Sequence, residues 1–213
     1  MLISDVMKTN VISVSSTTTL AEARRIMDLH KIRRLPIIDK LHLEGIVTKD
    51  DLDKMGLSQL TTFNIHEMVY LLNRITVRDV MHRDVITVPP DTTIEEAVSL
   101  AQSRRVGSLL ITEKEQVIGI ATTNDIFLHV LNPLFGIGKP GTRICVINCF
   151  TGLDIEKVVA VINKMKVRLV NLFVTEFPEV GKHDLILHLE DDNSSGVAEE
   201  IRKLGFKVDI RKR

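Results

Sequence analysis

Short apolar runs alternate with a segment of helical periodicity at the start of the chain. Leu20, Ala23 and Met27 fall on one face of a helix, and Thr19 with Glu22 has the capping-box spacing that marks where this helix begins. The apolar runs on either side have the length and composition of strands. The pattern therefore predicts a β-α-β-β-α unit with strands at Val11–Val14, Leu35–Ile38 and Gly45–Thr48.

The same pattern occurs a second time. Asp-Val-Met at residues 5–7 and Asp-Val-Met at residues 79–81 are 74 positions apart, and this register holds without a gap for about fifty residues. A match of this length is stronger than any short motif, so the chain contains two copies of one unit. The predicted strands of the second copy are Val85–Val88, Leu109–Thr112 and Gly119–Thr122, and Thr93 with Glu96 repeats the helix cap. An amphipathic segment, Ile65–Ile75, lies between the copies and suits a helix that packs on them.

A different pattern follows Leu131–Gly141, a stretch with two Pro and three Gly that breaks both periodicities. We expect repeats at about 1–56 and 76–130 within a module covering 1–130, a linker at 131–141 and a second domain at 142–213. The second domain has the order βαββαβ of an open ferredoxin-like sheet, which places the chain in the α/β (α+β) class. Its predicted elements are Arg143–Cys149, Asp154–Lys166, Leu169–Thr175, Asp184–Leu189, Gly196–Leu204 and Phe206–Ile210.

Charge and composition argue against two classes of partner. Lys plus Arg and Asp plus Glu both number 28, so no overall basic field attracts nucleic acid, and only 4% of residues are aromatic, with no Trp. The chain begins without a basic region followed by an apolar run, and no stretch approaches the ~20 apolar residues of a membrane span. We therefore expect a cytoplasmic protein without nucleic-acid or membrane partners.

Cysteine and histidine point to no metal or redox site. Cys145 and Cys149 are an even number of positions apart, so they would share one face of a strand as ordinary buried thiols. There is no CxxC pair, and the seven His residues are scattered. We expect no metal ligands and no disulfide.

The most informative motifs are Gly45–Asp51 (GIVTKDD) and Gly119–Asp125 (GIATTND), each at a turn from strand to helix. Thr48 with Asp51, and Thr122 with Asp125, fit two interpretations. In one they cap helices and contribute about 1 kcal/mol each. In the other, the carboxylate accepts hydrogen bonds from ribose hydroxyls while the threonine hydroxyl bridges to sugar or phosphate.

The cations that a phosphate requires are distributed unequally between the copies. Arg33 and Arg34 immediately precede a strand in the first copy and offer planar forks suited to phosphate, although they also suit a solvated helix end. The second copy has Gly107 and Ser108 at the equivalent positions, and Arg104 and Arg105 lie three residues earlier. We therefore expect only one fully equipped phosphate site.

The duplicated unit, the RLPIID string and the two G-h-x-T-x-x-D motifs resemble CBS domains over residues 1 to about 130. The resemblance implies a pair of repeats with two clefts that commonly bind adenine nucleotides or S-adenosylmethionine-like ligands. It implies ribose contacts from Thr48, Asp51, Thr122 and Asp125. It also implies adenine slots at Val11, Ile12, Val85, Ile86 and Pro36, and phosphate contacts from Arg33 and Arg34, as in the gamma subunit of the energy-sensing kinase.

The order of domains and the segment IHEMVYLLNRITVRDVM resemble the CBS–ACT proteins of the acetoin-utilization-protein-B type. ACT domains often pair sheet edge to sheet edge, and some bind amino acids at the turn after the first strand, here Phe150–Asp154. This turn has one glycine and lacks the second glycine usual in the ligand loop. A homodimer is the stronger expectation, and an effector in the second domain the weaker one.

The leading functional hypothesis is a sensor that binds AMP, ADP, ATP or S-adenosylmethionine as a regulatory ligand and signals to an unidentified target protein. A scaffolding dimer without ligand is the alternative. Catalysis is disfavoured because the sequence shows no nucleophile–base constellation, P-loop, dinucleotide fingerprint or metal cluster. We expect no catalytic residues and no obligatory cofactor.

Overall fold

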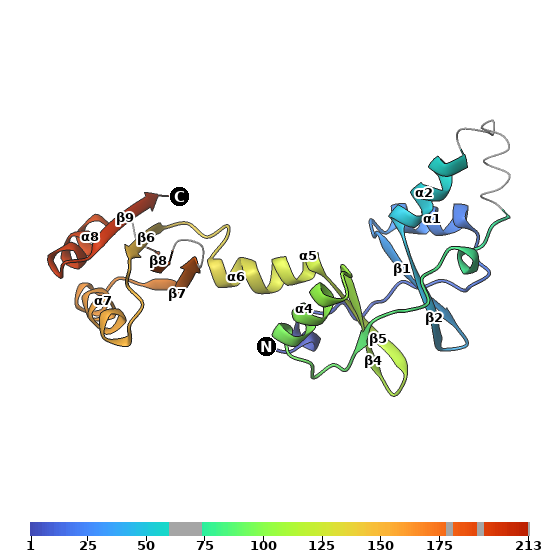
Figure 1. Cartoon of the computed structure of the whole chain (residues 1–213), viewed down its shortest axis with the longest axis horizontal. Helices are drawn as coiled ribbons and strands as arrows, with labels where there is room; N and C mark the ends of the chain where they lie inside the picture. The colour runs from blue at the N-terminus through green and yellow to red at the C-terminus, as the bar shows by residue number, and fades with distance from the viewer. Residues whose placement is uncertain (60–73, 178–180, 191–193, 213) are drawn as a thin grey trace. The chain divides into compact units, whose positions relative to one another are not determined.

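The computed structural model describes residues 1–59, 74–177, 181–190 and 194–212, and it divides into two compact units, Met1–Ile126 and Phe127–Arg213 (Figure 1). Most of the helical segment expected at 65–75 lies outside the described residues.

The first repeat consists of two helices packed on a two-stranded antiparallel sheet. A single 3-10 turn, η1 (Ile3–Asp5), precedes it. Its elements are α1 (Leu20–Leu29), β1 (Arg34–Asp39), β2 (His42–Thr48) and α2 (Lys49–Gln59). β1, β2 and the start of α1 confirm the sequence prediction, and the Thr19 hydroxyl accepts the Glu22 backbone N–H at 3.2 Å as the capping box requires.

The second repeat has the same order. It follows η2 (Val77–Asp79), and its three-stranded sheet has the order β3-β4-β5, with β3 parallel and β5 antiparallel to β4. Figure 1 shows its strands in green beside the blue strands of the first repeat. Its elements are β3 (Thr87–Val88), α4 (Ile94–Ser103), β4 (Ser108–Glu113), β5 (Gln116–Thr122) and α5 (Thr123–Ile126).

The first strand of each repeat is shorter than predicted. In the first repeat only Val14 pairs, through a parallel bridge to Ile37, and in the second repeat only β3 forms. The cause is local: the Val11 N–H donates to the Thr9 carbonyl at 3.0 Å, and the Val85 N–H donates to the Arg83 carbonyl at 3.0 Å. These tight turns keep the first residues of each apolar run out of the sheet.

The segment that precedes each repeat pairs with the third strand of the other repeat, an arrangement that we call the exchange. Lys8 pairs with Ile120 of the second repeat through two backbone hydrogen bonds of 2.9 and 3.0 Å, and His82 pairs with Ile46 of the first repeat through two of 2.9 Å. The fully buried Val77 completes the apolar core of the first repeat. Each half of the first unit therefore contains residues from both copies, which makes the two copies mutually dependent.

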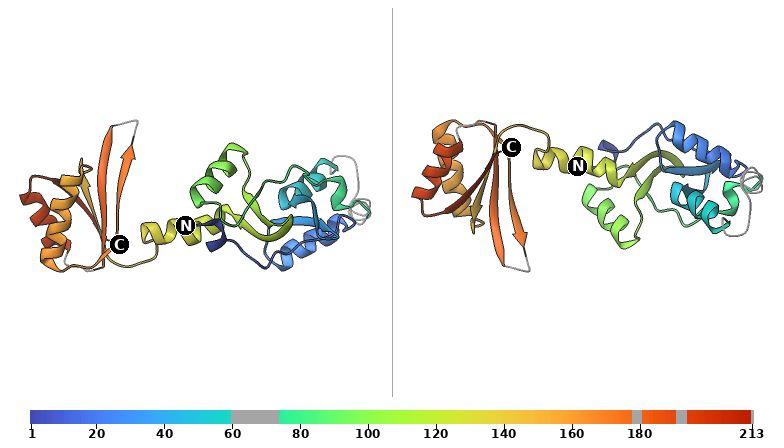
Figure 2. Two further views of the ribbon diagram at one scale, coloured as in Figure 1. Left: turned by 90° about the horizontal axis from the view of Figure 1, so that it is seen from below. Right: turned by 90° about the horizontal axis from the view of Figure 1, so that it is seen from above.

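The second unit is a four-stranded antiparallel sheet of order β7-β8-β6-β9. Its two helices lie on one face of the sheet (Figure 2). This is the predicted βαββαβ order, and each predicted element is present. The elements are β6 (Thr142–Ile147), α7 (Gly152–Met165), β7 (Leu169–Phe177), β8 (Lys182–Leu189), α8 (Ser194–Lys203) and β9 (Lys207–Lys212).

The two cysteines do not share a face, so that prediction was wrong. β6 ends at Ile147, and Asn148 takes a left-handed conformation with φ of 55°, which turns the chain. Cys149 is consequently buried in the core under the helices, whereas Cys145 lies on the opposite face, 3.7 Å from the Asp184 carboxylate. Burial raises the pKa of both thiols to about 11, so both are protonated at neutral pH.

The glycine- and proline-rich stretch predicted as a linker contains structure of its own. A π-helix, η3 (Phe127–Leu131), leads into α6 (Asn132–Phe135), which ends at Gly136 with φ of 59°. Phe135 meets Phe173 of β7 edge to face, with ring centroids 5.0 Å apart. The segment therefore packs as part of the second unit. Across the described ranges, no helix has the length and apolar character needed to cross a membrane.

The exchange predicts unequal costs for two equivalent substitutions. A methyl group at Gly45 would lie 2.8 Å from the carbonyl oxygen of His82, which the backbone pairing fixes. At Gly119 the three atoms nearest to it would all belong to the flexible side chain of Met7. We expect Gly45→Ala to lower the free energy of unfolding by about 1–3 kcal/mol, and Gly119→Ala to lower it by less.

Urea denaturation of the unchanged protein and the two variants measures this difference. Gly152→Ala is the control, because nothing lies within 4 Å of a methyl group added at Gly152. A loss at Gly119 equal to or larger than that at Gly45 would contradict the proposed rigidity of the pairing.

Candidate ligand-binding clefts

Two open clefts in the first unit have volumes of about 400 and 560 Å³. Sites for small ligands have roughly 300–1,000 Å³. Ile12 and Pro36 of the first repeat and Ile120 of the second supply apolar wall to the smaller cleft, which we call the first cleft. The larger cleft, which we call the second cleft, is lined by the equivalent residues of the opposite repeats. Ile86 is equivalent to Ile12, Leu110 to Pro36 and Ile46 to Ile120.

Each cleft combines residues from both repeats. Thr122 lies in the first cleft with Arg33 and Arg34, while Thr48 lies in the second cleft with Val85 and Ile86. Motif analysis had considered the threonine and arginine motifs copy by copy. The structure instead joins the end of the third strand of one repeat to the first strand of the other, because the repeats exchange their leading segments.

Asp125 is fully buried behind the wall of the first cleft, where Thr122 donates to one carboxylate oxygen and the Lys8 ammonium forms an ion pair with the other. Oδ2 accepts the Thr122 backbone N–H at 2.9 Å and the Thr122 hydroxyl at 2.5 Å, and Oδ1 lies 2.8 Å from the Lys8 ammonium. Burial on its own would raise the pKa of this carboxyl, but the hydrogen bonds from Lys8 and Thr122 outweigh it and lower the pKa. Asp125 is therefore a carboxylate at neutral pH.

Asp51 repeats this arrangement at the second cleft. Its Oδ2 accepts the Thr48 backbone N–H at 2.9 Å and the Thr48 hydroxyl at 2.6 Å, and its Oδ1 lies 3.1 Å from Nε2 of His82. Burial again favours a raised pKa, and the hydrogen bonds from Thr48 and His82 lower it.

Lys8 and His82 are site residues that motif analysis missed. A signal for them was present, because the 74-residue register aligns them directly after the two Asp-Val-Met strings. Their role required the exchange, which brings each one to the carboxylate of the other repeat.

The capping interpretation of the two motifs is visible in the geometry, and the ribose interpretation stays a prediction. The N–H groups of Asp51 and Asp125 donate to the hydroxyls of Thr48 and Thr122 at 3.3 and 3.4 Å, which completes a capping box at each corner. Of the predicted site residues, eight lie on cleft walls: Thr48, Thr122, Arg33, Arg34, Pro36, Ile12, Val85 and Ile86. Val11, Asp51 and Asp125 do not form part of these walls.

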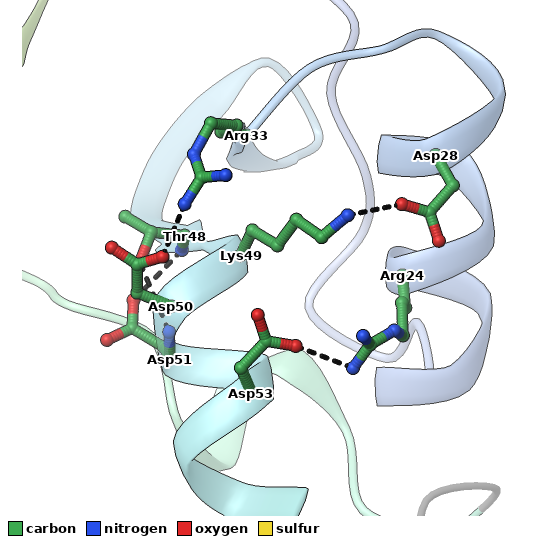
Figure 3. A network of polar contacts seen from close by, with 8 residues as sticks. All are labelled: Arg24, Asp28, Arg33, Thr48, Lys49, Asp50, Asp51 and Asp53. Carbon is green, nitrogen blue, oxygen red and sulfur yellow. Dashed lines mark hydrogen bonds and ion pairs between the residues drawn. The ribbon is translucent and has the colours of Figure 1, made fainter.

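Arg33 forms an ion pair with an acidic side chain of α2. Its Nη2 lies 2.6 Å from the Asp50 carboxylate, an ion pair drawn in Figure 3. Figure 3 also shows the pairs of Lys49 with Asp28 at 2.6 Å and of Arg24 with Asp53 at 2.7 Å, both of which connect α2 to α1.

The second cleft does not lack cations, contrary to the expectation from Gly107 and Ser108. Arg104 and Arg105 lie on its wall together with Arg83, and Arg34 reaches it from the first repeat. Among the residues that the structure describes, no three His, Cys, Asp or Glu side chains converge as a metal site would require.

Comparison with known proteins identifies the repeats. The CBS domain family model matches residues 3–56 and 77–132, which together make up more than half of the chain, so the protein belongs to the CBS domain family. The prediction of a CBS pair is confirmed.

Solved structures show the same pair. A putative acetoin utilization protein (AcuB) from Vibrio cholerae is 28% identical, with a TM-score of 0.54 over 62% of this chain and 92% of that one. The CBS domain pair of protein MJ0100, in complex with 5′-methylthioadenosine and S-adenosyl-L-methionine, is 27% identical, with a TM-score of 0.51 over 61% of this chain and 98% of that one.

Enzymes also contain related segments. The inosine-5′-monophosphate dehydrogenase of Korarchaeum cryptofilum is 30% identical over 151 residues, which cover 70% of this chain but only 28% of the enzyme. The chain thus spans less than a third of this relative.

The buried carboxylate of Asp125 predicts a pH-dependent contribution to stability. Because its pKa is lowered in the folded protein, the contribution is present above the ordinary value of 3.8 and is lost as pH falls through the lowered value. Asp125→Asn should cost about 1–3 kcal/mol at pH 7. The difference from the unchanged protein should shrink below about pH 4.

Urea denaturation between pH 7 and pH 3 measures this, with Asp53→Asn as the control, because the Asp53 pair with Arg24 is exposed and should contribute little. A difference that stays constant down to pH 3 would show that the charge of Asp125 does not contribute to stability.

Proposed function

We propose that this protein is a regulator that binds adenosyl ligands such as AMP, ADP, ATP or S-adenosylmethionine in the two clefts of its CBS pair, and that it is not itself an enzyme. The observation that carries the proposal is the composition of the clefts. Each one places an apolar wall, a threonine hydroxyl and cationic side chains around one open space. These are the groups that an adenine, a ribose and a tail with a phosphate or a carboxylate require.

The similarity to the MJ0100 domain pair supports the adenosyl class. Both ligands in that complex, 5′-methylthioadenosine and S-adenosyl-L-methionine, carry an adenosyl group, and the similarity covers nearly the whole of that pair. In our proposal, adenine packs against Ile12 and Pro36 in the first cleft and against Val85 and Ile86 in the second. The exposed Lys8 ammonium moves aside, so that the ribose hydroxyls donate to Asp125.

Binding would favour one arrangement of the two repeats. Since each cleft has walls from both repeats, a ligand contacts both at once and stabilises their association. A target protein that recognises the associated pair would then respond to the ligand. This is the physical basis for a sensor role.

We further propose that the second unit is an ACT-like domain that holds a homodimer. Its βαββαβ sheet has β7 and β9 as outer strands, and β7 exposes Leu169 and Val174 to 38% and 42%. Such strand edges pair readily with a second copy. Analytical ultracentrifugation should give twice the chain mass of 24.0 kDa, and a single-chain mass at micromolar concentration would refute the dimer.

A calorimetric screen of AMP, ADP, ATP, NADH, S-adenosylmethionine and cyclic dinucleotides tests the ligand class. Asp51→Ala and Asp125→Ala should each weaken binding at the neighbouring cleft by roughly 1.5–3 kcal/mol, because hydrogen bonds from ribose to a charged acceptor are lost. Asp53→Ala, whose carboxylate faces α1, is the matched control. Lowered stability with unchanged affinity would leave the two carboxylates as helix caps only.

A thermal unfolding screen separates the sensor from a scaffold without ligand. A ligand at 100 times its Kd stabilises by about 2.7 kcal/mol, which shifts the melting temperature by several degrees in a chain of this size. If no adenosyl compound changes the melting temperature, the scaffold hypothesis is favoured. If a bound nucleotide is turned over, the regulator hypothesis fails.

A further inference from the structure

Four arginines line the second cleft without a carboxylate partner. They are Arg34, Arg83, Arg104 and Arg105. Across the described ranges, no carboxylate lies within ion-pair distance of any of them, although Asp84 also lines this cleft. Four fixed positive charges around one open space of about 560 Å³ leave a strong excess of positive potential after the single Asp84 is counted.

Arg34 crosses from the first repeat into this cleft because Gly107 has no side chain. A methyl group at Gly107 would overlap Nη2 of Arg34, so the guanidinium lies directly against the Gly107 backbone. Arg34 also lines the first cleft, which makes it common to both. The glycine at position 107, where the first repeat has Arg33, is therefore what admits Arg34 from the other repeat.

Arg105 is held by its backbone in an unfavourable conformation. Its φ of 53° lies in the left-handed region, which favours glycine or asparagine, and its equivalent in the first cleft, Lys31, has the same φ of 53° and is also cationic. Lys40 and Lys114 form another equivalent pair of left-handed cations, with φ of 49° and outside both clefts, so it is the place of Arg105 on the cleft wall that makes its charge available to a ligand.

The first cleft differs in charge despite its equivalent backbone. Two of its four cations are committed to carboxylates, Lys8 to Asp125 at 2.8 Å and Arg33 to Asp50 at 2.6 Å. Lys31 and the common Arg34 remain for a ligand. The second cleft therefore offers more uncommitted positive charge, in the form of guanidinium forks that bind phosphate oxygens in pairs.

We infer that the second cleft is a site for nucleosides with two or more phosphates, held by Arg34, Arg83, Arg104 and Arg105, whereas the first cleft takes adenosyl ligands with little negative charge. The inference rests on the proposed function, since it assigns the ligand class to each of the two clefts. Because Arg34 is common to both, occupation of the second cleft draws a cation away from the first.

Isothermal titration of the full chain with adenosine, AMP, ATP and tripolyphosphate tests this assignment. ATP should bind at least tenfold more tightly than AMP, since each additional charge-assisted contact contributes about this factor or more. Raised salt should reduce the advantage of ATP more than it reduces adenosine binding.

Arg105→Gly separates affinity from folding. It removes the charge and relieves the left-handed backbone, so the melting temperature should be unchanged or higher while the affinity for ATP falls about tenfold. Lys114→Gly is the matched control, because Lys114 is also a left-handed cation, with φ of 49°, but lies in a hairpin turn outside both clefts.

Gly107→Ala tests the crossing of Arg34. The added methyl group displaces the guanidinium, so the affinity for ATP should fall about tenfold with no change in the affinity for adenosine, and Gly152→Ala should change neither.

Equal affinities of the unchanged protein for AMP and ATP, or variants that leave ATP binding intact, would overturn the inference while adenosine binding still supported the proposed function. Tripolyphosphate binding as tight as that of ATP would overturn the nucleoside assignment, and no binding of any adenosyl compound would refute the proposed function itself.

Discussion

The backbone pairing of each repeat's leading segment with the third strand of the other repeat is the constraint on which the rest of the first unit depends. The pairs Lys8–Ile120 and His82–Ile46 bring an ammonium to Asp125 and an imidazole to Asp51, and Gly45 and Gly119 leave room for this approach. The clefts are composite as a result. A ligand in either one bridges both copies, and its binding energy acts on their association rather than on one repeat alone.

Local interactions made much of the fold predictable from the sequence. Helix starts follow from capping spacings such as Thr19 with Glu22, and the strands of the second unit follow from two-residue alternation. The exchange was not predictable in the same way. A perfect 74-residue register is equally compatible with pairing inside one copy or between copies, so it identified equivalent residues but not which of them meet. Lys8 and His82 were missed for that reason.

Other differences between the sequence predictions and the structure came from backbone geometry that hydrophobic patterns do not encode. The apolar run at Val11–Val14 has the composition of a strand, but the turn at Thr9 directs the Val11 N–H into a local bond. The left-handed Asn148 separates Cys145 from Cys149 in the same manner. The stretch 131–141 contains Pro and Gly and still packs, because Phe135 has an aromatic partner on β7. Motif analysis considered only residues 104, 105, 107 and 108 of the second copy and so overlooked Arg34 of the first, which Gly107 admits.

The contacts at Asp125 also limit which ligands the first cleft can accept. The exposed pair of Arg33 with Asp50 contributes little to stability by itself, so it sets no strong requirement on the ligand. Asp125 is different, because its fully buried carboxylate would be left partly unpaired if Lys8 departed without replacement, at a cost of several kcal/mol. A ligand that draws Lys8 away must therefore donate hydrogen bonds to Asp125 in the same step. A diol such as ribose meets this requirement and an inorganic anion does not, so the buried pair favours nucleosides over free phosphate.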